Sequence, residues 1–157
     1  MKNNRIFWFV AVIGLVLDRI TKELIVQNFS ENQTLPIISG IFHFTYVVNT
    51  GAAFSFFRDG VNWLRWLSLI VSLGLIIFAL ITPRIKTIEQ LGYGFILAGA
   101  LGNGIDRFLL GYVVDFLDLR VINFPVFNIA DVCINFGIVF LLIASFPSLK
   151  TSDKRRK

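Results

Sequence analysis

The sequence is poor in the residues from which most enzyme active sites are built. Among its 157 residues there is one cysteine, Cys133, and one histidine, His43. A single cysteine forms no intramolecular disulfide, and inside an apolar segment we interpret Cys133 as a small packing residue. His43 has no second histidine or cysteine near it, whereas a protein metal site draws on several such side chains. We therefore expect neither a bound metal nor another cofactor.

Several familiar catalytic and nucleotide-binding motifs are also missing. The sequence contains no Gly-x-Ser-x-Gly elbow, no His-Glu-x-x-His pair and no glycine-rich phosphate-binding loop. Serine-hydrolase, zinc-peptidase and nucleotide-dependent chemistry are therefore not indicated. The polar residues that remain for chemistry are mainly carboxylates, amides and a few cations.

Charge is scarce as well. Only 16% of the residues are charged, compared with roughly 25% in a typical soluble domain, and the mean hydropathy is +0.73. Four hydrophobic segments, 6–26, 61–81, 88–105 and 128–146, each approach the ~20 residues that a bilayer requires. No Ala-x-Ala cleavage site follows the first segment, so we expect it to be retained as a span. The sequence predicts one membrane domain, 1–157, built on a four-helix bundle.

The basic residues predict how this bundle is oriented. The net charge is +5, but nine of the 15 Lys and Arg residues lie in three short segments that flank the hydrophobic ones. This distribution is typical of membrane topology rather than of nucleic-acid binding. Two spans separate each cluster from the next, so all three clusters lie on the same side of the membrane. The positive-inside rule makes this side cytoplasmic, and both termini lie there as well. The clusters are Lys2 and Arg5; Arg84 and Lys86; and Lys150, Lys154, Arg155, Arg156 and Lys157.

The two longer connections, 27–60 and 106–127, then lie on the outer side. Residues 41–48 alternate between two faces, with Phe42, Phe44 and Tyr46 on one of them, which is the period of a β-strand. The second connection also has an extended character. Because unpaired strands are not tolerated in lipid, we expect a small extracytoplasmic β-sheet, or cradle, on the outer membrane surface.

Small residues in the third span predict close helix packing. Gly94, Ala98 and Gly102 recur every four residues and share one face, with Gly99 nearby. Small side chains at this spacing let a neighbouring helix approach closely.

Two aspartates lie in apolar surroundings. Asp115 is flanked by Val114 and Phe116, and Asp131 lies at the start of the last span. An ionisable residue in such a place is costly and is by default a functional-site hypothesis. Two carboxylates held close together do not both ionise easily, so one stays protonated while the other acts as a base. Such a pair, titrating as one unit, can activate a water molecule against a peptide carbonyl.

Other polar residues converge on the same outer ends, and each also has a structural interpretation. Asp18 and Lys22, like Arg19 and Glu23, have the spacing of helical ion pairs. We expect Asp18 and Lys22 to support the site rather than to catalyse.

The third and fourth spans bring further polar residues to this level. Asn103, Asp106 and Arg107 share one helix face, where Arg107 neutralises Asp106 or anchors at lipid headgroups. Asn128 is a favourable residue for the N-cap of the last span. Capping by Asn128 does not explain why an aspartate, Asp131, lies one turn inside this helix. Asp118 and Arg120 are expected on the solvent face of a loop.

Four motifs, taken together with Asp18 and Lys22, resemble the bacterial lipoprotein signal peptidases, also called signal peptidase II. They occur in the family's order, and the resemblance covers residues 6–148. One small departure is Val132, where the family often has serine. The motifs are Asn49-Thr50-Gly51-Ala52-Ala53-Phe54-Ser55, Gly99-Ala100-Leu101-Gly102-Asn103-Gly104-Ile105-Asp106-Arg107, Val113-Val114-Asp115-Phe116 and Phe127-Asn128-Ile129-Ala130-Asp131.

The resemblance implies an aspartyl endopeptidase of the bacterial plasma (inner) membrane. Its site would face the extracytoplasmic side, and its partners would be membrane lipid and prolipoproteins whose lipobox cysteine carries diacylglycerol. It would cut just before that cysteine, and we expect it to act as a monomer. By residue-by-residue match, Asp115 and Asp131 are the catalytic pair. The matched polar positions that order the site or contact substrate are Asn49, Asn103, Arg107 and Asn128, and the supporting positions are Asp18, Lys22, Gly51 and Asp106.

Three other functions fit part of this pattern. A proton-coupled membrane transporter also uses intramembrane carboxylates, but here the polar residues gather on one side, and no inverted repeat is visible. A presenilin-like protease requires a Gly-x-Gly-Asp element, which the segment 102–106 does not supply. For a lipid-binding scaffold, the two carboxylates would be an unexplained cost.

Overall fold

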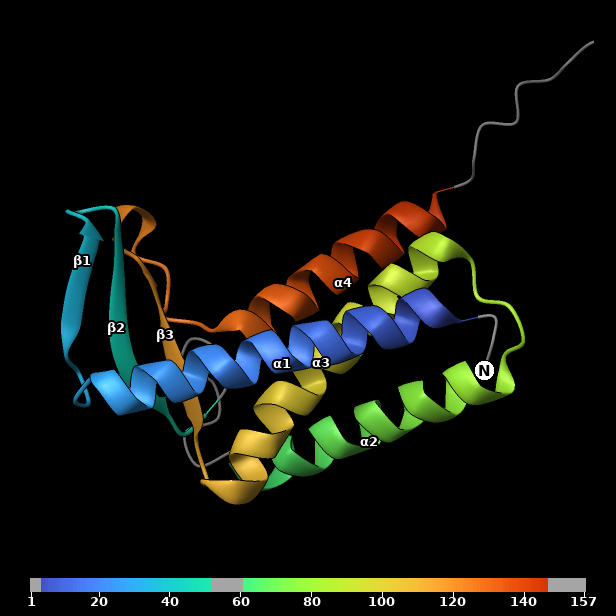
Figure 1. Ribbon diagram of the computed structural model, residues 1–157, viewed down its shortest axis with the longest axis horizontal. Coiled ribbons are helices and arrows are strands. Elements are labelled where there is room, and N and C mark those ends of the chain that lie inside the picture. Colours follow the sequence, from blue (N-terminus) through green and yellow to red (C-terminus); the bar gives the residue numbers. More distant parts are fainter. Residues whose placement is uncertain (1–3, 52–60, 147–157) are drawn as a thin grey trace, which may run out of the picture.

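Four long helices and a three-stranded sheet make up the part of the chain that the computed structural model describes, residues 4–51 and 61–146. The helices run side by side, and the sheet lies across one end of them (Figure 1). The N-terminal end of α1 and the C-terminal end of α4 lie at the opposite end. The elements in order are α1 (Arg5–Asn28), β1 (Thr34–Ile38), β2 (Phe42–Asn49), α2 (Val61–Ile81), α3 (Thr87–Leu109), β3 (Val113–Leu119), the short 3-10 helix η2 (Arg120–Ile122) and α4 (Ile129–Ser145).

The four helices coincide closely with the four predicted hydrophobic segments. The main difference is in α3, which continues to Leu109, whereas the hydrophobic segment ends at residue 105. Asp106 and Arg107 therefore belong to the helix and not to the outer connection. The helix stops where Gly111 takes a φ of +80°, a left-handed conformation that favours glycine.

By length and hydropathy alone, one helical stretch in the described residues, Trp63–Ile81, is sufficient to cross a bilayer. The apolar helix Ile129–Ser145 is shorter than such a span. Helices α1 and α3 are long enough, but each carries several charged residues, among them Asp18 and Lys22 in α1 and Asp106 and Arg107 in α3.

The sheet is antiparallel, with the strand order β1-β2-β3. Strand β2 is the strand predicted over residues 41–48, and β3 lies in the second predicted outer connection. Strand β1 was not predicted from the alternation of residues. It is an edge strand, where Pro36 is tolerated because one side of an edge strand needs no ladder hydrogen bonds, and its register shifts between Pro36 and Ile38.

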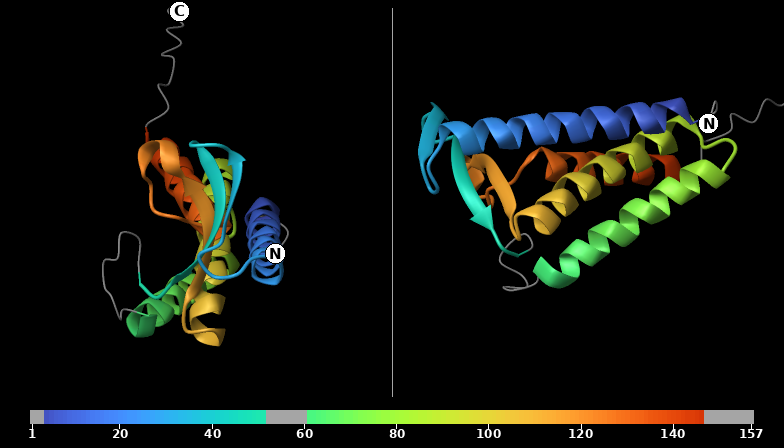
Figure 2. Two further views of the ribbon diagram at one scale, coloured as in Figure 1. Left: turned by 90° about the vertical axis from the view of Figure 1, so that its left-hand side faces the viewer. Right: turned by 60° about the horizontal axis from the view of Figure 1, so that its bottom comes forward.

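Helix α3 is the centre of the bundle and packs against α1, α2 and α4 (Figure 2). The predicted small-residue face of α3 turns toward α1. A Cβ added to Gly94 would lie 2.8 Å from the Phe7 carbonyl oxygen, and one added to Gly102 would lie 2.5 Å from Asp18 Oδ2. On another side of α3, Gly99 lies directly against the Ala130 carbonyl of α4. The predicted close packing is thus confirmed, with α1 and α4 as the two partners.

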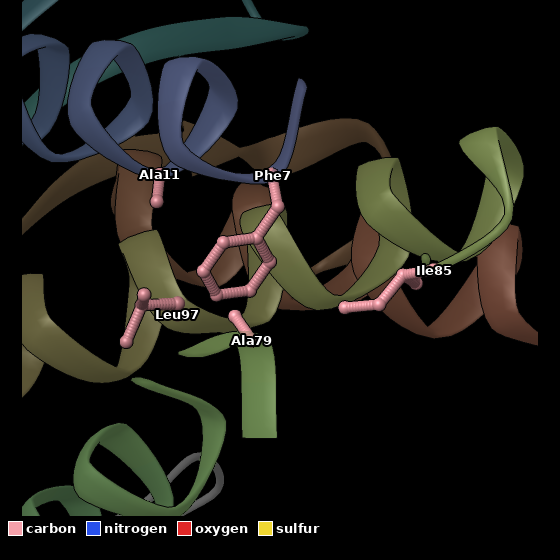
Figure 3. Close-up of a cluster of buried hydrophobic side chains, with 5 residues drawn as sticks. All are labelled: Phe7, Ala11, Ala79, Ile85 and Leu97. Carbon is pink, nitrogen blue, oxygen red and sulfur yellow. The ribbon is translucent and has the colours of Figure 1, made fainter. Parts of the chain in front are cut away.

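Among the described residues, two buried apolar clusters pack the elements together, one at each end of the bundle. One of them, drawn in Figure 3, joins α1, α2 and α3 at the end away from the sheet. The other packs the sheet against the last turns of α1. The first consists of Phe7, Ala11, Ala79, Ile85 and Leu97, and the second of Ile25, Tyr46, Val114 and Phe116.

The outer surfaces of the helices are apolar. Large side chains such as Phe9, Leu73, Ile81 and Leu142 are about half exposed or more. Exposed apolar surface on this scale is unusual for a soluble monomer and typical of a surface that faces lipid or a partner.

Candidate active site

A cavity of about 330 Å³ lies where the sheet meets one end of α3 and α4. Polar side chains from four elements enter it, and a stretch of the connection before α4 supplies much of its apolar wall. Asp115 and Asp131 both line this cavity, so the structure brings the two predicted carboxylates together. The lining residues are Asn49, Asn103, Arg107, Val113, Asp115, Phe124, Pro125, Val126, Phe127, Asp131, Ile134 and Asn135.

Asp115 is presented by β3 and is only 2% exposed. Its Oδ2 atom accepts a hydrogen bond from Asn49 Nδ2 at 2.7 Å, and its Oδ1 atom accepts one from Asn128 Nδ2 at 2.6 Å. Burial, and then the negative charge of Asp131, raise the pKa of Asp115 from 3.8 to about 7. Asp115 therefore holds a proton under conditions in which an ordinary aspartate is fully ionised.

Asp131 is presented by the first turn of α4. Asn128 is the N-cap residue of this helix, and its side-chain oxygen accepts from the Asp131 backbone N–H at 3.0 Å. Asp131 Oδ2 in turn accepts from the Asn128 backbone N–H at 3.2 Å, which completes a capping box. The expectation that capping leaves Asp131 unexplained is therefore wrong, because an acidic residue at the third helical position closes the box. Its other oxygen, Oδ1, accepts from Asn103 Nδ2 at 2.8 Å.

Asn128 connects the two carboxylates. It is fully buried, and its Nδ2 atom lies within hydrogen-bonding distance of Asp115 Oδ1 and of Asn103 Oδ1, the latter at 3.0 Å. Its oxygen caps α4 as described. One side chain thus fixes β3, α3 and the start of α4 relative to one another, which keeps the carboxylate of Asp115 beside that of Asp131.

A buried ion cluster lies behind this pair. Lys22 is 1% exposed, and its Nζ atom lies 3.0 Å from Asp18 Oδ2, 2.8 Å from Asp106 Oδ2 and 3.0 Å from Asn103 Oδ1. These three acceptors match the three donors of an ammonium group. The predicted Asp18–Lys22 pair is confirmed, and the structure adds Asp106 and Asn103 to it.

Both aspartates of the cluster also hold backbone groups near the cavity. Asp18 Oδ1 accepts from the Ala130 N–H at 2.9 Å, which satisfies a donor in the first turn of α4. Asp106 Oδ2 accepts from the Val114 N–H at 3.3 Å, next to Asp115. Sequence spacing gave no sign of these roles, because both contacts join residues of different elements.

Two ion pairs suggested by helical spacing do not form. Arg19 bonds to Asp106 and not to Glu23, which accepts from Gln27. Arg107 does not neutralise Asp106. Instead it lines the cavity and donates to the backbone carbonyls of Asn103 and Gly51, each at 3.4 Å.

Gly51 and Asn49 form a local turn at the cavity wall. The Gly51 N–H donates to Asn49 Oδ1 at 2.9 Å, which leaves the Asn49 amide nitrogen to bond Asp115. Residues 52–55, which complete this motif in the sequence, lie outside the described residues. The same is true of Lys2 and of the basic residues 150–157.

His43 and Asp118 lie in the sheet and Arg120 begins η2, and none of the three lines the cavity. Asp118 is buried in β3, not on the solvent face of a loop, and accepts from the Thr45 hydroxyl at 2.7 Å and from Arg120 at 3.0 Å. These hydrogen bonds and Arg120 lower the pKa of Asp118, although its burial acts in the opposite direction. Within the described residues, no group of three or more His, Cys, Asp or Glu side chains is placed to hold a metal ion.

The fold and the site together have the parts of a membrane hydrolase that uses carboxylates. A helical bundle with an apolar outer surface carries, at one end, two aspartates in one cavity, and one of them has a strongly raised pKa. Perturbed carboxylates in a cavity are typical of acid–base catalysis.

Comparisons with known proteins agree with this class. The sequence profile of the family described as signal peptidase (SPase) II matches residues 10–147. The lipoprotein signal peptidase of Microcystis aeruginosa is 69% identical over 93% of this chain and 95% of its own length. That of Gloeothece citriformis is 66% identical over 98% and 97%. The chain belongs to the signal peptidase II family and is a peptidase.

A solved structure has the same fold. It is described as a bacterial membrane enzyme, and it superposes on this chain with a TM-score of 0.83 at 28% identity, covering 95% of this chain and 92% of the other. The predicted family, peptidase activity and helical fold with a small sheet are therefore confirmed. The proton-coupled transporter is not favoured.

Proposed function

We propose that this peptidase removes the signal peptide from prolipoproteins whose lipobox cysteine carries diacylglycerol, and that it cuts just before this cysteine. The observation that carries the proposal is the meeting of Asp115 and Asp131 in one cavity at the sheet end of the bundle. The names of the relatives, which are lipoprotein signal peptidases, support the substrate class.

We propose further that the four helices span the bacterial inner membrane, with both termini in the cytoplasm. The apolar outer faces of the helices support this arrangement. So does the position of Arg84 and Lys86 between α2 and α3, at the end of the bundle away from the sheet. The sheet and the cavity then lie at the extracytoplasmic face, and the chain works there as a monomeric, single-domain enzyme.

This location suits a lipid-anchored peptide. The acyl chains of a diacylglyceryl cysteine remain in the outer leaflet, so the neighbouring peptide bond is held near the membrane surface. The cavity can contact both the apolar and the polar parts of such a substrate, because Phe124, Val126 and Ile134 line it together with the carboxylates. Loss of the substrate's lipid would therefore remove both its anchor and part of its apolar contact.

In the proposed mechanism, Asp131 is the base. Its carboxylate accepts hydrogen bonds from Asn103 Nδ2 and from the Asn128 N–H, and it lies in the first turn of a helix, where a negative charge is favoured. Asp131 takes a proton from a water molecule, and the oxygen of this water attacks the scissile carbonyl carbon.

Asp115 is the acid of the proposed pair. With a pKa of about 7 it is largely protonated at slightly acidic pH and donates a hydrogen bond to the carbonyl oxygen, where negative charge develops. The tetrahedral intermediate then breaks its C–N bond as a proton passes from the pair to the leaving amine. The two carboxyl groups titrate as one unit.

The test is cleavage of a diacylglyceryl-modified prolipoprotein by the purified protein, followed as a size shift. We expect cleavage in the presence of chelators and near-total loss of it in Asp115→Asn and in Asp131→Asn. Asp118→Asn is the matched control, because this carboxylate lies in the same strand as Asp115 but outside the cavity. Thermal unfolding confirms that each variant is folded. Full activity in either cavity variant would overturn the assignment of the pair.

The same assay tests the substrate class. A prolipoprotein with the same sequence but without diacylglycerol should be cut much more slowly. Equal rates for the two substrates would refute lipid-dependent recognition while leaving the carboxylate pair in place.

A further inference from the structure

Asn135 is a polar residue of the cavity that neither the family motifs nor the carboxylate chemistry uses. It lies on α4 four residues after Asp131, which is about 6 Å further along the helix axis and toward the membrane centre. The side chain is exposed and lines the cavity together with Ile134. From Phe136 onward, α4 is apolar until Ser145.

The hydrogen bonds of Asn135 are only partly satisfied by the protein. Its Nδ2 atom donates to the Asp131 carbonyl at 2.9 Å. In the part of the chain that the structure describes, its carboxamide oxygen and second N–H have no protein partner. An amide side chain has two donors and an oxygen that accepts, and at membrane depth unpaired polar groups are costly. An occupant of the cavity with complementary polar groups would remove this cost.

The proposed substrate brings such groups to this level. A signal peptide that crosses the bilayer as a helix from the cytoplasm has its C-terminal end at the cavity. The last four carbonyl groups of any helix have no partner within the helix, and water is scarce at this depth. These carbonyl groups therefore need hydrogen-bond donors from the enzyme, on the membrane side of the scissile bond.

We propose that Asn135 is a substrate-binding residue, whose carboxamide donates a hydrogen bond to a main-chain carbonyl of the signal peptide about one helical turn before the scissile bond. This inference rests on the proposed function. The bond is to the peptide backbone, so it serves signal peptides of different sequence. It holds the peptide at the register that brings the scissile carbonyl to Asp131, one turn further out.

The test compares the kinetics of three variants on a diacylglyceryl-modified prolipoprotein with those of the unaltered protein. Asn135→Leu removes the amide at nearly constant size, and we expect KM to rise roughly three- to tenfold, the size of one net hydrogen bond, with little change in kcat. Asn135→Gln, which keeps the amide, should recover part of this loss. Asn28→Leu is the matched control, because Asn28 is also exposed and bonds the carbonyl four residues before it, Leu24, but lies outside the cavity.

The outcomes separate this inference from the proposed function. If the unaltered protein fails to cut the substrate, the proposed function falls and the role of Asn135 falls with it. If the unaltered protein cuts but Asn135→Leu has an unchanged KM, only the inference is wrong. A lower kcat at constant KM would instead make Asn135 a positioning residue for Asp131 and would equally overturn substrate binding. A glutamine variant as poor as the leucine variant would also contradict the hydrogen bond.

Discussion

At the scale of single residues, Lys22 neutralises the carboxylates behind the proposed catalytic pair. Asp18 and Asp106 are both fully buried, and each has a second task in holding a backbone N–H beside the cavity. Without a cation between them, two buried carboxylates would repel each other. Lys22 thus holds two carboxylates that bond backbone N–H groups beside the cavity, although it does not line the cavity itself.

The first prediction concerns this lysine. Lys22→Met leaves the charge of Asp18 without its cation, and loss of one partner of a buried pair typically costs about 3–5 kcal/mol of stability. We expect a large fall in the free energy of unfolding, measured by denaturant titration in detergent. Lys86→Met is the control, because the exposed Lys86–Glu89 pair contributes at most ~1 kcal/mol. Equal stability of the two variants would contradict the role given to the buried cluster.

A second prediction follows from Asp115. Because its pKa is raised to about 7, the folded chain binds this proton more tightly than the unfolded chain does. The contribution of Asp115 to stability is therefore fully present below its ordinary pKa of 3.8 and is lost as the pH rises through 7. We expect the melting temperature of the unaltered protein to fall more steeply than that of Asp115→Asn between about pH 4 and pH 7, and the two slopes to converge above the folded pKa of about 7.

The cleavage rate should also depend on the protonation of Asp115. Since protonated Asp115 is the proposed acid, kcat/KM should decrease as the pH rises above about 7. A pH–rate profile that stays flat through this range would argue against Asp115 as the acid, even if both aspartates are essential.

The residues of the site were largely predictable from the sequence, but their contacts were not. Asp115 and Asp131 are conspicuous because charge is costly in apolar segments. In contrast, Asp18 bonds Ala130, a residue 112 positions later in the chain, and no local spacing indicates such a contact. The wrong pairing of Arg19 with Glu23 has the same origin, because a helical spacing describes only one helix.

At the scale of elements, the position of Asp131 depends on how closely α4 packs on α3. Gly99 lies against the Ala130 carbonyl, so a side chain at Gly99 would push the first turn of α4 away. We expect Gly99→Ala to lower both thermal stability and the cleavage rate, since overpacking typically costs about 1–3 kcal/mol. Both quantities are measured on the purified protein.

The control for this prediction is Gly74→Ala in α2. A Cβ at Gly74 meets no atom within 4 Å, and alanine is favoured over glycine in a helix by about 0.5–1 kcal/mol. This variant should be neutral or slightly stabilised with normal activity. Unchanged cleavage in Gly99→Ala would show that the placement of Asp131 does not require this close contact.

The elements themselves were predicted with uneven success. The four helices are visible as long hydrophobic segments and β2 as an alternating pattern, whereas β1 has no pattern that distinguishes it from a loop. Strand β1 forms because it pairs with β2 through backbone hydrogen bonds. Thr34 lies opposite Thr45, and their hydroxyl groups are 2.5 Å apart. The strand conformation of β1 therefore depends on its pairing in the sheet and not on a pattern in its own sequence. Helix α3 extends past the hydrophobic segment to Leu109, because its last turn carries the polar residues Asp106 and Arg107, which a hydrophobicity criterion leaves out.

At the scale of the whole molecule, the polar residues of the candidate site gather at one end of a helical bundle whose outer surface is apolar. The cavity, the ion cluster and the sheet all lie at one end, and the hydrophobic cluster around Phe7 lies at the other. For a protein that spans a membrane, this asymmetry has a functional consequence. In the proposed orientation, water and the scissile peptide bond meet the carboxylates at one membrane surface, so no polar path across the bilayer is needed.

The last prediction tests this orientation. On a Cys133→Ala background, a cysteine introduced at Glu31, which is exposed between α1 and β1, should react in intact cells with a membrane-impermeant maleimide. A cysteine at Lys86, exposed between α2 and α3, should react only after the membrane is permeabilised. The reason is that the basic residues around Lys86 remain on the cytoplasmic side. Labelling of Lys86→Cys from outside would invert the bundle and move the carboxylate pair to the cytoplasmic face, where a prolipoprotein's lipidated cysteine is not found.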